Sequence, residues 1–236
     1  MRQANHLRTL EDGIALIVAL LATLVLSALG LSLMVMASTE TLIAANYRDG
    51  VEAFHAAEAA LERAIPELAS VPDWSAVLGG AGVRSAAPST FTDASLSAVL
   101  ADGRTLDLVK TTNLLNCPHV FPPAATPCTA AQMDHSAGAR PWAGNNPRWR
   151  LYANGPVSAL GADIHSPFYV AVWVGDDPAE TDGDPARDGT DASSPGTGIL
   201  QVRSDAFGAG GSRRAVEATL GRAGAGLRII SWRLVR

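Results

Sequence analysis

A long run of apolar residues near the start of the chain determines most of the predicted organisation. No charged residue occurs between Asp12 and Glu40, and residues 13–39 read GIALIVALLATLVLSALGLSLMVMAST. A helix needs about 20 apolar residues to cross the hydrocarbon core of a bilayer, so this run is long enough. It is the only such run in the sequence, which predicts at most one membrane crossing. Arg2 and Arg8 precede it, which favours a cytoplasmic N-terminus and places the rest of the chain outside the cytoplasm.

Three kinds of N-terminal segment share this pattern. A secretory signal peptide has a shorter apolar region, of about 7–15 residues, followed by a small-residue cleavage site that Ala37 and Ser38 resemble. A signal anchor is the second interpretation. The third depends on Gly13, because a short polar leader, a glycine and an uninterrupted apolar helix are the arrangement of a prepilin. Prepilin peptidase cuts on the cytoplasmic side of the apolar segment, so the helix is kept.

The helical pattern continues beyond the apolar run. Residues 40–65 contain no proline, and Gly50 is their only glycine. Apolar residues recur there at steps of three and four, which predicts one stripe along a helix: Tyr47, Val51, Phe54, Ala57, Leu61 and Ile65. We therefore expect a helix over residues 14–65, apolar all round in its first half and amphipathic in its second. Pro66 is compatible with a kink or with the helix end.

The second half of the chain predicts an antiparallel sheet. Five short runs show partial apolar/polar alternation between Gly-, Pro- and Asp-rich breaks, over residues 148–154, 167–175, 198–207, 212–222 and 227–236. Ala209, Gly210 and Gly211 predict a hairpin turn. Between helix and sheet the pattern is weak: residues 89–100 favour a short helix with Asp93 near its start, and residues 106–115 fit a strand or a helix.

The expected fold class is therefore α+β, with a long N-terminal helix packed on a C-terminal antiparallel sheet. The predicted organisation is a leader, a spine helix whose first half spans the membrane, a mixed helix, strand and loop region, and a sheet head, over residues 1–13, 14–65, 66–147 and 148–236. With 47% hydrophobic and 17% charged residues the chain is not disordered overall, and its net charge of −5 argues against direct nucleic-acid binding.

Two side-chain groups outside the helix are candidates for special chemistry. Cys117 and Cys128 bracket a proline-rich loop, and outside the cytoplasm we expect a disulfide worth about 3 kcal/mol, with two free thiols as the alternative. Residues 176–191 hold six Asp and one Glu, which indicates a solvated loop between strands or a calcium site. The calcium ligands in the second interpretation are Asp182, Asp184 and Asp188. We predict no other cofactor. Neither G-x-S-x-G nor H-x-x-x-H occurs, so we expect no enzymatic activity.

The N-terminal third resembles a known family. The apolar helix followed by AANYRDGVEAFHAAEAALERAI is similar to the N-terminal region of PilX-type minor pilins of type IV pili. Members of that family carry an Asn/Arg/Asp-containing patch, here Asn46, Arg48 and Asp49. An F-x-A-A-E-A-A-L signature follows, here Phe54, Ala56, Ala57, Glu58, Ala59, Ala60 and Leu61. Residues 199–222 resemble the strand, Gly-rich turn and strand of the same family.

The resemblance implies a non-enzymatic subunit that is cleaved after Gly13 by prepilin peptidase and methylated on Ile14. It implies a single-pass inner-membrane protein with a periplasmic C-terminal domain, which later enters the pilus fibre. The implied role is to prime pilus assembly near the tip. The implied partners are other minor pilins, the major pilin and a tip adhesin.

Two positions depart from the general pilin pattern. Val18 is the fifth residue after Gly13, where most major pilins carry a Glu that neutralises a neighbouring N-terminal amine. A tip subunit has no such neighbour above it, which suggests a position at or near the tip. Glu11 and Asp12 precede Gly13, where a basic residue is usual. Two alternatives stay open: a tip-located minor pseudopilin of a type II secretion system, and a membrane-anchored periplasmic binding or hydrolytic domain.

Overall fold

The computed structural model describes residues 3–119, 122–123, 125–137, 146–161, 163–180, 183–189, 197–224 and 226–235, and for residues 3–13 it describes the backbone alone. The elements in chain order are α1 (Gln3–Ser70), α2 (Ser75–Leu78), β1 (Ser97–Val99), β2 (Thr105–Asp107), α3 (Leu108–Asn116), α4 (Ala130–Ala137), β3 (Arg150–Pro156), η2 (Val157–Ala159), β4 (Tyr169–Asp176), β5 (Ile199–Phe207), η3 (Ala209–Gly211), β6 (Arg213–Ala223) and β7 (Gly226–Val235). The chain divides into two compact units, Met1–Arg48 and Asp49–Arg236, which are described separately below.

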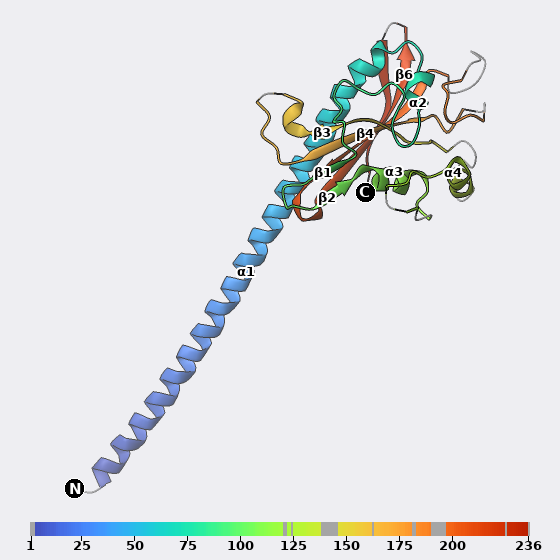
Figure 1. The fold of residues 1–236 in the computed structure, drawn as a ribbon. Helices are drawn as coiled ribbons and strands as arrows, with labels where there is room; N and C mark the ends of the chain where they lie inside the picture. Colours follow the sequence, from blue (N-terminus) through green and yellow to red (C-terminus); the bar gives the residue numbers. More distant parts are fainter. Residues whose placement is uncertain are drawn as a thin grey trace. The chain divides into compact units, whose positions relative to one another are not determined.

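The second unit is built around a five-stranded antiparallel sheet of order β3-β4-β5-β6-β7 (Figure 1). Each strand pairs with the next strand along the chain, and η3 makes the tight connection from β5 to β6. Gly210 and Gly211 in that connection have φ of 64° and 83°, a backbone conformation that glycine adopts without the penalty of a Cβ. The five predicted strands and the predicted turn are therefore confirmed, and with the long N-terminal helix they form a pilin-like α+β arrangement.

Both faces of the sheet carry apolar side chains because alternate residues of a strand point to opposite faces. On one face, the part of α1 after Arg48 and the short helix α2 pack on Val170, Val172, Val202 and other residues of the strands. On the other face, Leu106 and Leu108, at the junction of β2 and α3, pack on a different set: Trp149, Leu151, Tyr169, Ala171, Trp173 and Phe207. All eight residues of β4 are buried because both layers cover this strand.

Helix α1 continues through Pro66 and ends at Ser70. Pro66 has no backbone N–H to give to the carbonyl of Glu62, but both residues are exposed and water can supply the missing donor. Pro72 then disfavours helical geometry at Val71, so the helix ends just before it. The Trp74 indole Nε1 donates to the Leu68 carbonyl over 3.0 Å and fixes the chain as it turns away.

Two local predictions between helix and sheet change in the structure. The predicted helix over residues 89–100 is wrong. The carboxylate of Asp93 accepts from the Ser95 backbone N–H two residues on, which closes a turn instead of capping a helix, and β1 follows. Residues 106–115, left open between strand and helix, contain both. The chain leaves β2 at Asp107, whose carboxylate accepts from the Lys110 N–H and caps α3.

Candidate assembly site

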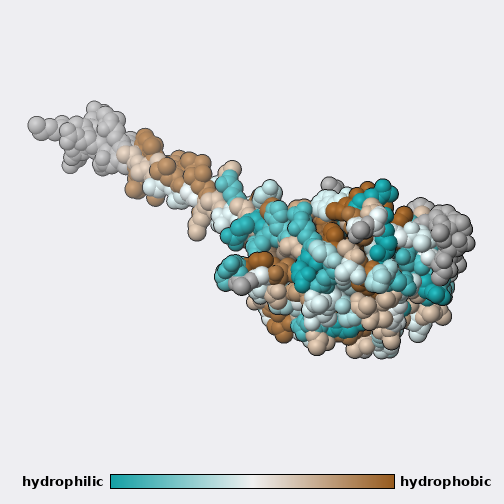
Figure 2. Space-filling view, turned by 90° about the horizontal axis from the view of Figure 1, so that it is seen from above, coloured by the Kyte–Doolittle hydropathy of each residue, from teal (hydrophilic) through white to brown (hydrophobic). Residues whose placement is uncertain are grey.

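Between residues 14 and 43, α1 exposes every large apolar side chain that it carries. From residue 14 to residue 43 the large apolar residues are between 53% and 70% exposed, and Figure 2 shows apolar residues of α1 in brown at the surface. An isolated helix of this composition is unfavourable in water because nothing buries its apolar surface. Residues 14–39, here called the apolar segment, therefore need lipid or other protein chains around them.

Several hydroxyl groups of the apolar segment donate to carbonyls of the same helix. Thr23 donates to the Leu20 carbonyl over 2.9 Å, Ser27 donates to the Thr23 carbonyl over 2.7 Å, and Ser38 donates to the Met34 carbonyl over 2.9 Å. A polar group without a partner is costly in hydrocarbon, and these bonds remove that cost. By length and composition, α1 is the one helix in the described part of the chain that can cross a membrane.

Residues 49–70 of α1, here called the signature helix, bury small side chains against the sheet. Ala53, Ala56, Ala57, Ala60 and Ala64 are at most 5% exposed. Alanine has no side chain beyond Cβ, so the helix backbone can approach the sheet closely along this face. The signature alanines thus have a packing role in this structure, beyond the helix propensity that alanine has anywhere.

The buried face is not centred on the stripe that the sequence predicted. Tyr47 is 75% exposed and Val51 is 38% exposed, while Phe54 and Ile65 lie half-buried at the margin of the contact. The predicted stripe consisted mainly of large apolar side chains. In the structure the centre of the contact is the alanine face together with Leu61 and Leu68, which are 2% and 0% exposed.

Three contacts join the start of the signature helix to the rest of the second unit. The Phe54 ring meets the Trp232 ring of β7 edge-on, with centroids 5.7 Å apart. Ser166 donates to the Glu52 carboxylate over 2.8 Å. Gly50 is covered by the Arg214 guanidinium, and a Cβ placed at residue 50 would lie 2.8 Å from its Nη2. A side chain at residue 50 would displace the Arg214 guanidinium from this position.

The charged and polar residues of the family pattern remain near the surface. Asn46 and Arg48 are exposed, and Asp49 is half-buried. The Glu58 carboxylate lies 3.4 Å from His55 Nδ1 on the same helix, in a solvent-accessible position. Val18 and Ile14, both in the apolar segment, are 59% and 63% exposed. The surroundings of Gly13 lie outside the part of the chain whose side chains are described.

A charged network on the opposite face of the sheet was not predicted. Arg203 donates to the carboxylates of Asp205 and Glu217 over 2.7 Å each, Arg213 also binds Asp205, and Arg233 donates to Glu217 over 2.9 Å. Burial alone lowers the pKa of the Arg203 guanidinium, but the two carboxylates outweigh it and raise that pKa above its ordinary value. The sequence did contain information that could have predicted this network. A hairpin centred on Gly210 places Arg203 opposite Glu217, and this is the observed register.

Beneath the signature helix lies the phenol of Tyr152, which is 2% exposed. Burial, with a smaller contribution from the charge of Glu67, raises the pKa of this phenol above its usual value. Tyr152 is therefore neutral at physiological pH and serves as an apolar packing surface for the helix.

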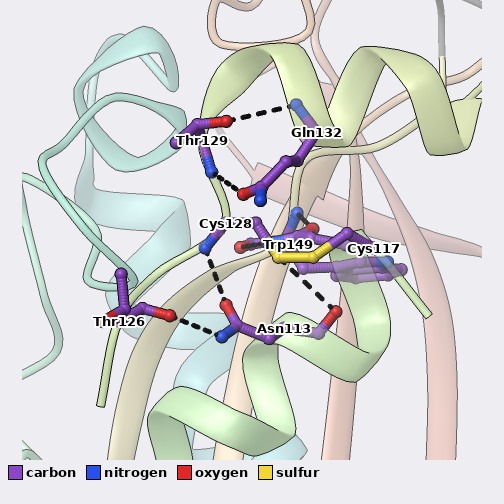
Figure 3. Close-up of a disulfide and its surroundings, with 8 residues drawn as sticks. Asn113, Cys117, Thr126, Cys128, Thr129, Gln132 and Trp149 are labelled. Carbon is purple, nitrogen blue, oxygen red and sulfur yellow. Dashed lines mark hydrogen bonds between the residues drawn. A yellow bond between two sulfur atoms is a disulfide. The ribbon is translucent and has the colours of Figure 1, made fainter. Parts of the chain in front are cut away.

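The structure contains the predicted disulfide between Cys117 and Cys128 (Figure 3). Asn113 of α3 ties the loop that it closes, since its Nδ2 donates to the Thr126 carbonyl over 2.8 Å and its Oδ1 accepts from the Cys128 N–H over 2.9 Å. Asn116 makes a matching pair of bonds to the backbone of Trp149, with Nδ2 donating over 3.0 Å and Oδ1 accepting over 2.7 Å. The disulfide and the two amides hold α3 and its loop against the sheet.

The acidic loop contains no assembled metal site among the described residues. Asp182 lies outside the described residues. The Asp184 carboxylate accepts from the Ala186 N–H over 3.2 Å, and that of Asp188 accepts from the Gly198 N–H over 2.7 Å. No group of three or more His, Cys, Asp or Glu side chains is placed to hold a metal ion in the part of the chain that the structure describes. Calcium binding by Asp182, Asp184 and Asp188 stays a prediction.

These features define a pilin-like protein: a helix with an exposed apolar segment, continuing into a face that packs on an antiparallel sheet. Residues 12–62 match the family model described as PilX N-terminal. The match covers the apolar segment, the Asn/Arg/Asp patch and the whole signature, and it supports a PilX-type type IV pilus pilin over this part of the chain. Comparison with curated proteins and with solved structures finds no match.

Proposed function

We propose that this protein is a minor pilin that primes assembly of a type IV pilus and sits near its tip. The observation that carries the proposal is the continuity of α1, in which an exposed apolar segment passes directly into a signature helix packed on the sheet. One helix can then serve two environments in turn, the inner membrane before assembly and the core of the fibre afterwards. The family match over residues 12–62 supports the same role.

The proposed partners are the other minor pilins, the major pilin and a tip adhesin. The apolar segment offers no charge that would oppose close contact with neighbouring helices, and the hydroxyls of Thr23 and Ser27 already bond within the helix. The head stays outside the inner membrane in the periplasm until the subunit is extracted. The role is structural, as the pilin family suggests.

Processing is the step that tests the proposal most directly. Prepilin peptidase would remove residues 1–13, and methylation would follow on Ile14. Intact-protein mass spectrometry of the full chain from its own cells should find a mature form that begins at Ile14 with one added methyl group. Deleting the peptidase should return the mass of the uncleaved chain.

The same experiment separates the alternatives. A membrane-anchored periplasmic domain keeps its mass when the peptidase is deleted, and a secretory signal peptide leaves a chain that begins near residue 39. Either result overturns the pilin proposal. A pseudopilin of a type II secretion system would also begin at Ile14, so isolated type IV pili must then be tested for this subunit.

The tip position follows from Val18, which cannot neutralise a neighbouring N-terminal amine. Labelling the head of this subunit in isolated fibres should give signal at fibre ends. Uniform decoration along the shaft would overturn the tip position without affecting the processing result.

A further inference from the structure

The two edges of the sheet differ in how they are closed. The outer edge of β3 is covered by the chain itself, since residues 83–93 run beside it: Leu151 donates to the Val83 carbonyl over 2.7 Å and Asp93 donates to the Asn154 carbonyl over 2.7 Å. Strand β7 is the other edge, and none of the described residues forms a strand outside it. A long edge strand with unpaired backbone groups can pair with another chain.

Strand β7 also exposes large apolar side chains. Ile229 is 55% exposed, Ile230 is 46%, Trp232 is 42% and Leu234 is 44%. In the register with β6, Ile229, Trp232 and Leu234 stand opposite buried residues of the helix-facing core, so they point to the side of the sheet where the signature helix lies. Ile230 is the extra residue of a bulge, and regular pairing with β6 resumes at Ser231.

A shallow groove runs between β7 and the signature helix. It has a volume of about 280 Å³ and is lined by Glu58, Leu61, Glu62, Ile65, Ile229 and Trp232. Four of these residues are apolar and two are acidic, and both acidic residues come from the helix. The contact between Phe54 and Trp232 adds an aromatic wall beside it. The groove therefore presents apolar surface along a free strand edge, with negative charge on the helix side.

We propose that the groove and the outer edge of β7 bind an extended segment of a different polypeptide chain. The segment pairs with residues 231–235, beyond the bulge. It places apolar side chains against Trp232 and Leu234, and a lysine or arginine beside Glu58 and Glu62. The inference rests on the proposed function for the source of this chain, which is another subunit of the same fibre.

Strand addition fits these features because main-chain hydrogen bonds supply affinity while alternate side chains supply specificity. The acidic pair selects the partner's charge: a basic side chain gains from both carboxylates, whereas an acidic one is repelled. The Arg233 guanidinium is engaged with Glu217 on the opposite face, so it does not neutralise the groove.

Charge also argues against a second copy of this chain as the partner. A symmetric pair of β7 strands related by a twofold axis would form one continuous sheet with both signature helices on the same face. The two acidic pairs, Glu58 and Glu62 of each copy, would then face each other across the junction. Like charges brought together in this way disfavour the pairing.

The test is photocrosslinking in cells that build the fibre, with the full chain carrying p-benzoylphenylalanine at residue 232 as the probe. Leu114 on α3 is 45% exposed and gives the matched control position. We expect an adduct from residue 232 to a different polypeptide, mapped to a stretch with alternate apolar residues and a nearby lysine or arginine. The control position should not give this adduct.

Charge reversal sharpens the test. Glu58→Lys combined with Glu62→Lys should lower the yield of the adduct about tenfold. Asp163→Lys adds positive charge at an exposed site outside the groove, and should leave the yield unchanged. Thermal unfolding of each variant shows whether the head is intact, and a second probe at residue 234 replaces the first if the change at Trp232 unfolds it.

Other outcomes overturn the inference. They are an adduct to a second copy, an adduct to lipid, an adduct to a helical segment, or no adduct from either probe while fibres assemble. The N-terminus of the same sample separates this inference from the proposed function. A chain that begins at Ile14 without the adduct refutes strand binding alone. A chain that keeps residues 1–13 and still forms the adduct refutes the pilin role alone.

Discussion

The two parts of α1 have the same secondary structure but opposite packing: the apolar segment exposes large side chains, and the signature helix buries small ones. In the apolar segment, leucine, isoleucine and valine dominate, and these side chains are more than half exposed. In the signature helix, alanines occupy the contact face and are almost fully buried. Large side chains maximise the apolar surface offered to a surrounding medium, whereas small ones allow the closest approach to a surface that is already formed.

The difference shows that apolar residues in one helix need not share a function. The apolar segment and the head belong to separate compact units, so we expect changes in the segment to alter the environment of the chain and leave the fold of the second unit intact. The signature helix belongs to the core of that unit, and changes there should alter its stability. The predictions below test this division, beginning with the largest expected effect.

Charges in the apolar segment should prevent stable membrane association. Leu24 and Leu26 are each 67% exposed, near the middle of the segment. An arginine at the centre of a spanning helix costs about 3 kcal/mol, so Leu24→Arg with Leu26→Arg costs about 6 kcal/mol. We expect the variant to be extracted from membranes at alkaline pH while the native chain stays embedded.

The division between the parts predicts that this double variant keeps the native unfolding temperature of the head, measured by circular dichroism on the full chain in detergent. Leu24→Ile with Leu26→Ile is the matched control and should behave as the native chain does. A double-arginine variant that remains embedded would refute the membrane role of the segment. A lowered unfolding temperature would refute the independence of the two parts.

Loss of the disulfide should have the opposite effects: it should destabilise the head and leave membrane association unchanged. Closing the loop between Cys117 and Cys128, 11 residues apart in sequence, stabilises the head by about 3 kcal/mol in the chain-entropy model. Cys117→Ser with Cys128→Ser should lower the free energy of unfolding by that amount in urea titration of the full chain. Membrane retention should not change.

The native chain treated with a reductant is the control for this pair, and it should unfold at the same lower urea concentration as the double variant. Equal stability of the oxidised and reduced native chains would contradict the prediction.

Overpacking should reveal how closely the signature helix approaches the sheet. Ala57 is fully buried, whereas Ala69, the last residue but one of α1, is exposed. Ala57→Leu should lower the free energy of unfolding by about 1–3 kcal/mol because the added atoms force the helix away from the sheet. Ala69→Leu adds the same atoms at a solvent-facing site and should change stability by less than about 0.5 kcal/mol. Equal effects at the two sites would mean that the alanine face is not a close contact.

The sequence predicted the fold well where local rules are strong. The apolar segment is visible from its lack of charge, and the strands are visible from their alternation and their glycine-rich breaks. The helix predicted over residues 89–100 failed because pairing beside β3 depends on distant residues such as Asn154, which no local pattern reveals. Asp107 shows the same limit, since one residue ends a strand and caps a helix.

The assembly site was predicted only in part. The signature residues were found through a family pattern, but the periodicity of large residues pointed to Tyr47 and Val51, which lie at the surface. Alanine is compatible with either a buried or an exposed face, so the sequence pattern alone does not identify the contact. The groove was not predicted because it joins residues more than 150 positions apart, such as Glu58 and Trp232.

The smallest expected effect concerns the margin of the signature helix, where Phe54 meets Trp232 with ring centroids 5.7 Å apart. Edge-to-face aromatic pairs contribute about 1 kcal/mol beyond the area that they bury. A double-mutant cycle with Phe54→Leu and Trp232→Leu should therefore give a coupling energy of about 1 kcal/mol in the free energy of unfolding. Pairing Phe54→Leu with Leu114→Ala, which lies on α3, should give additive effects. Because Phe54 is half-buried, either single change should cost less than Ala57→Leu. A larger loss of unfolding free energy at Phe54 than at Ala57 would mean that the main helix–sheet contact lies at the margin of the signature helix. That result would contradict a contact centred on the alanine face.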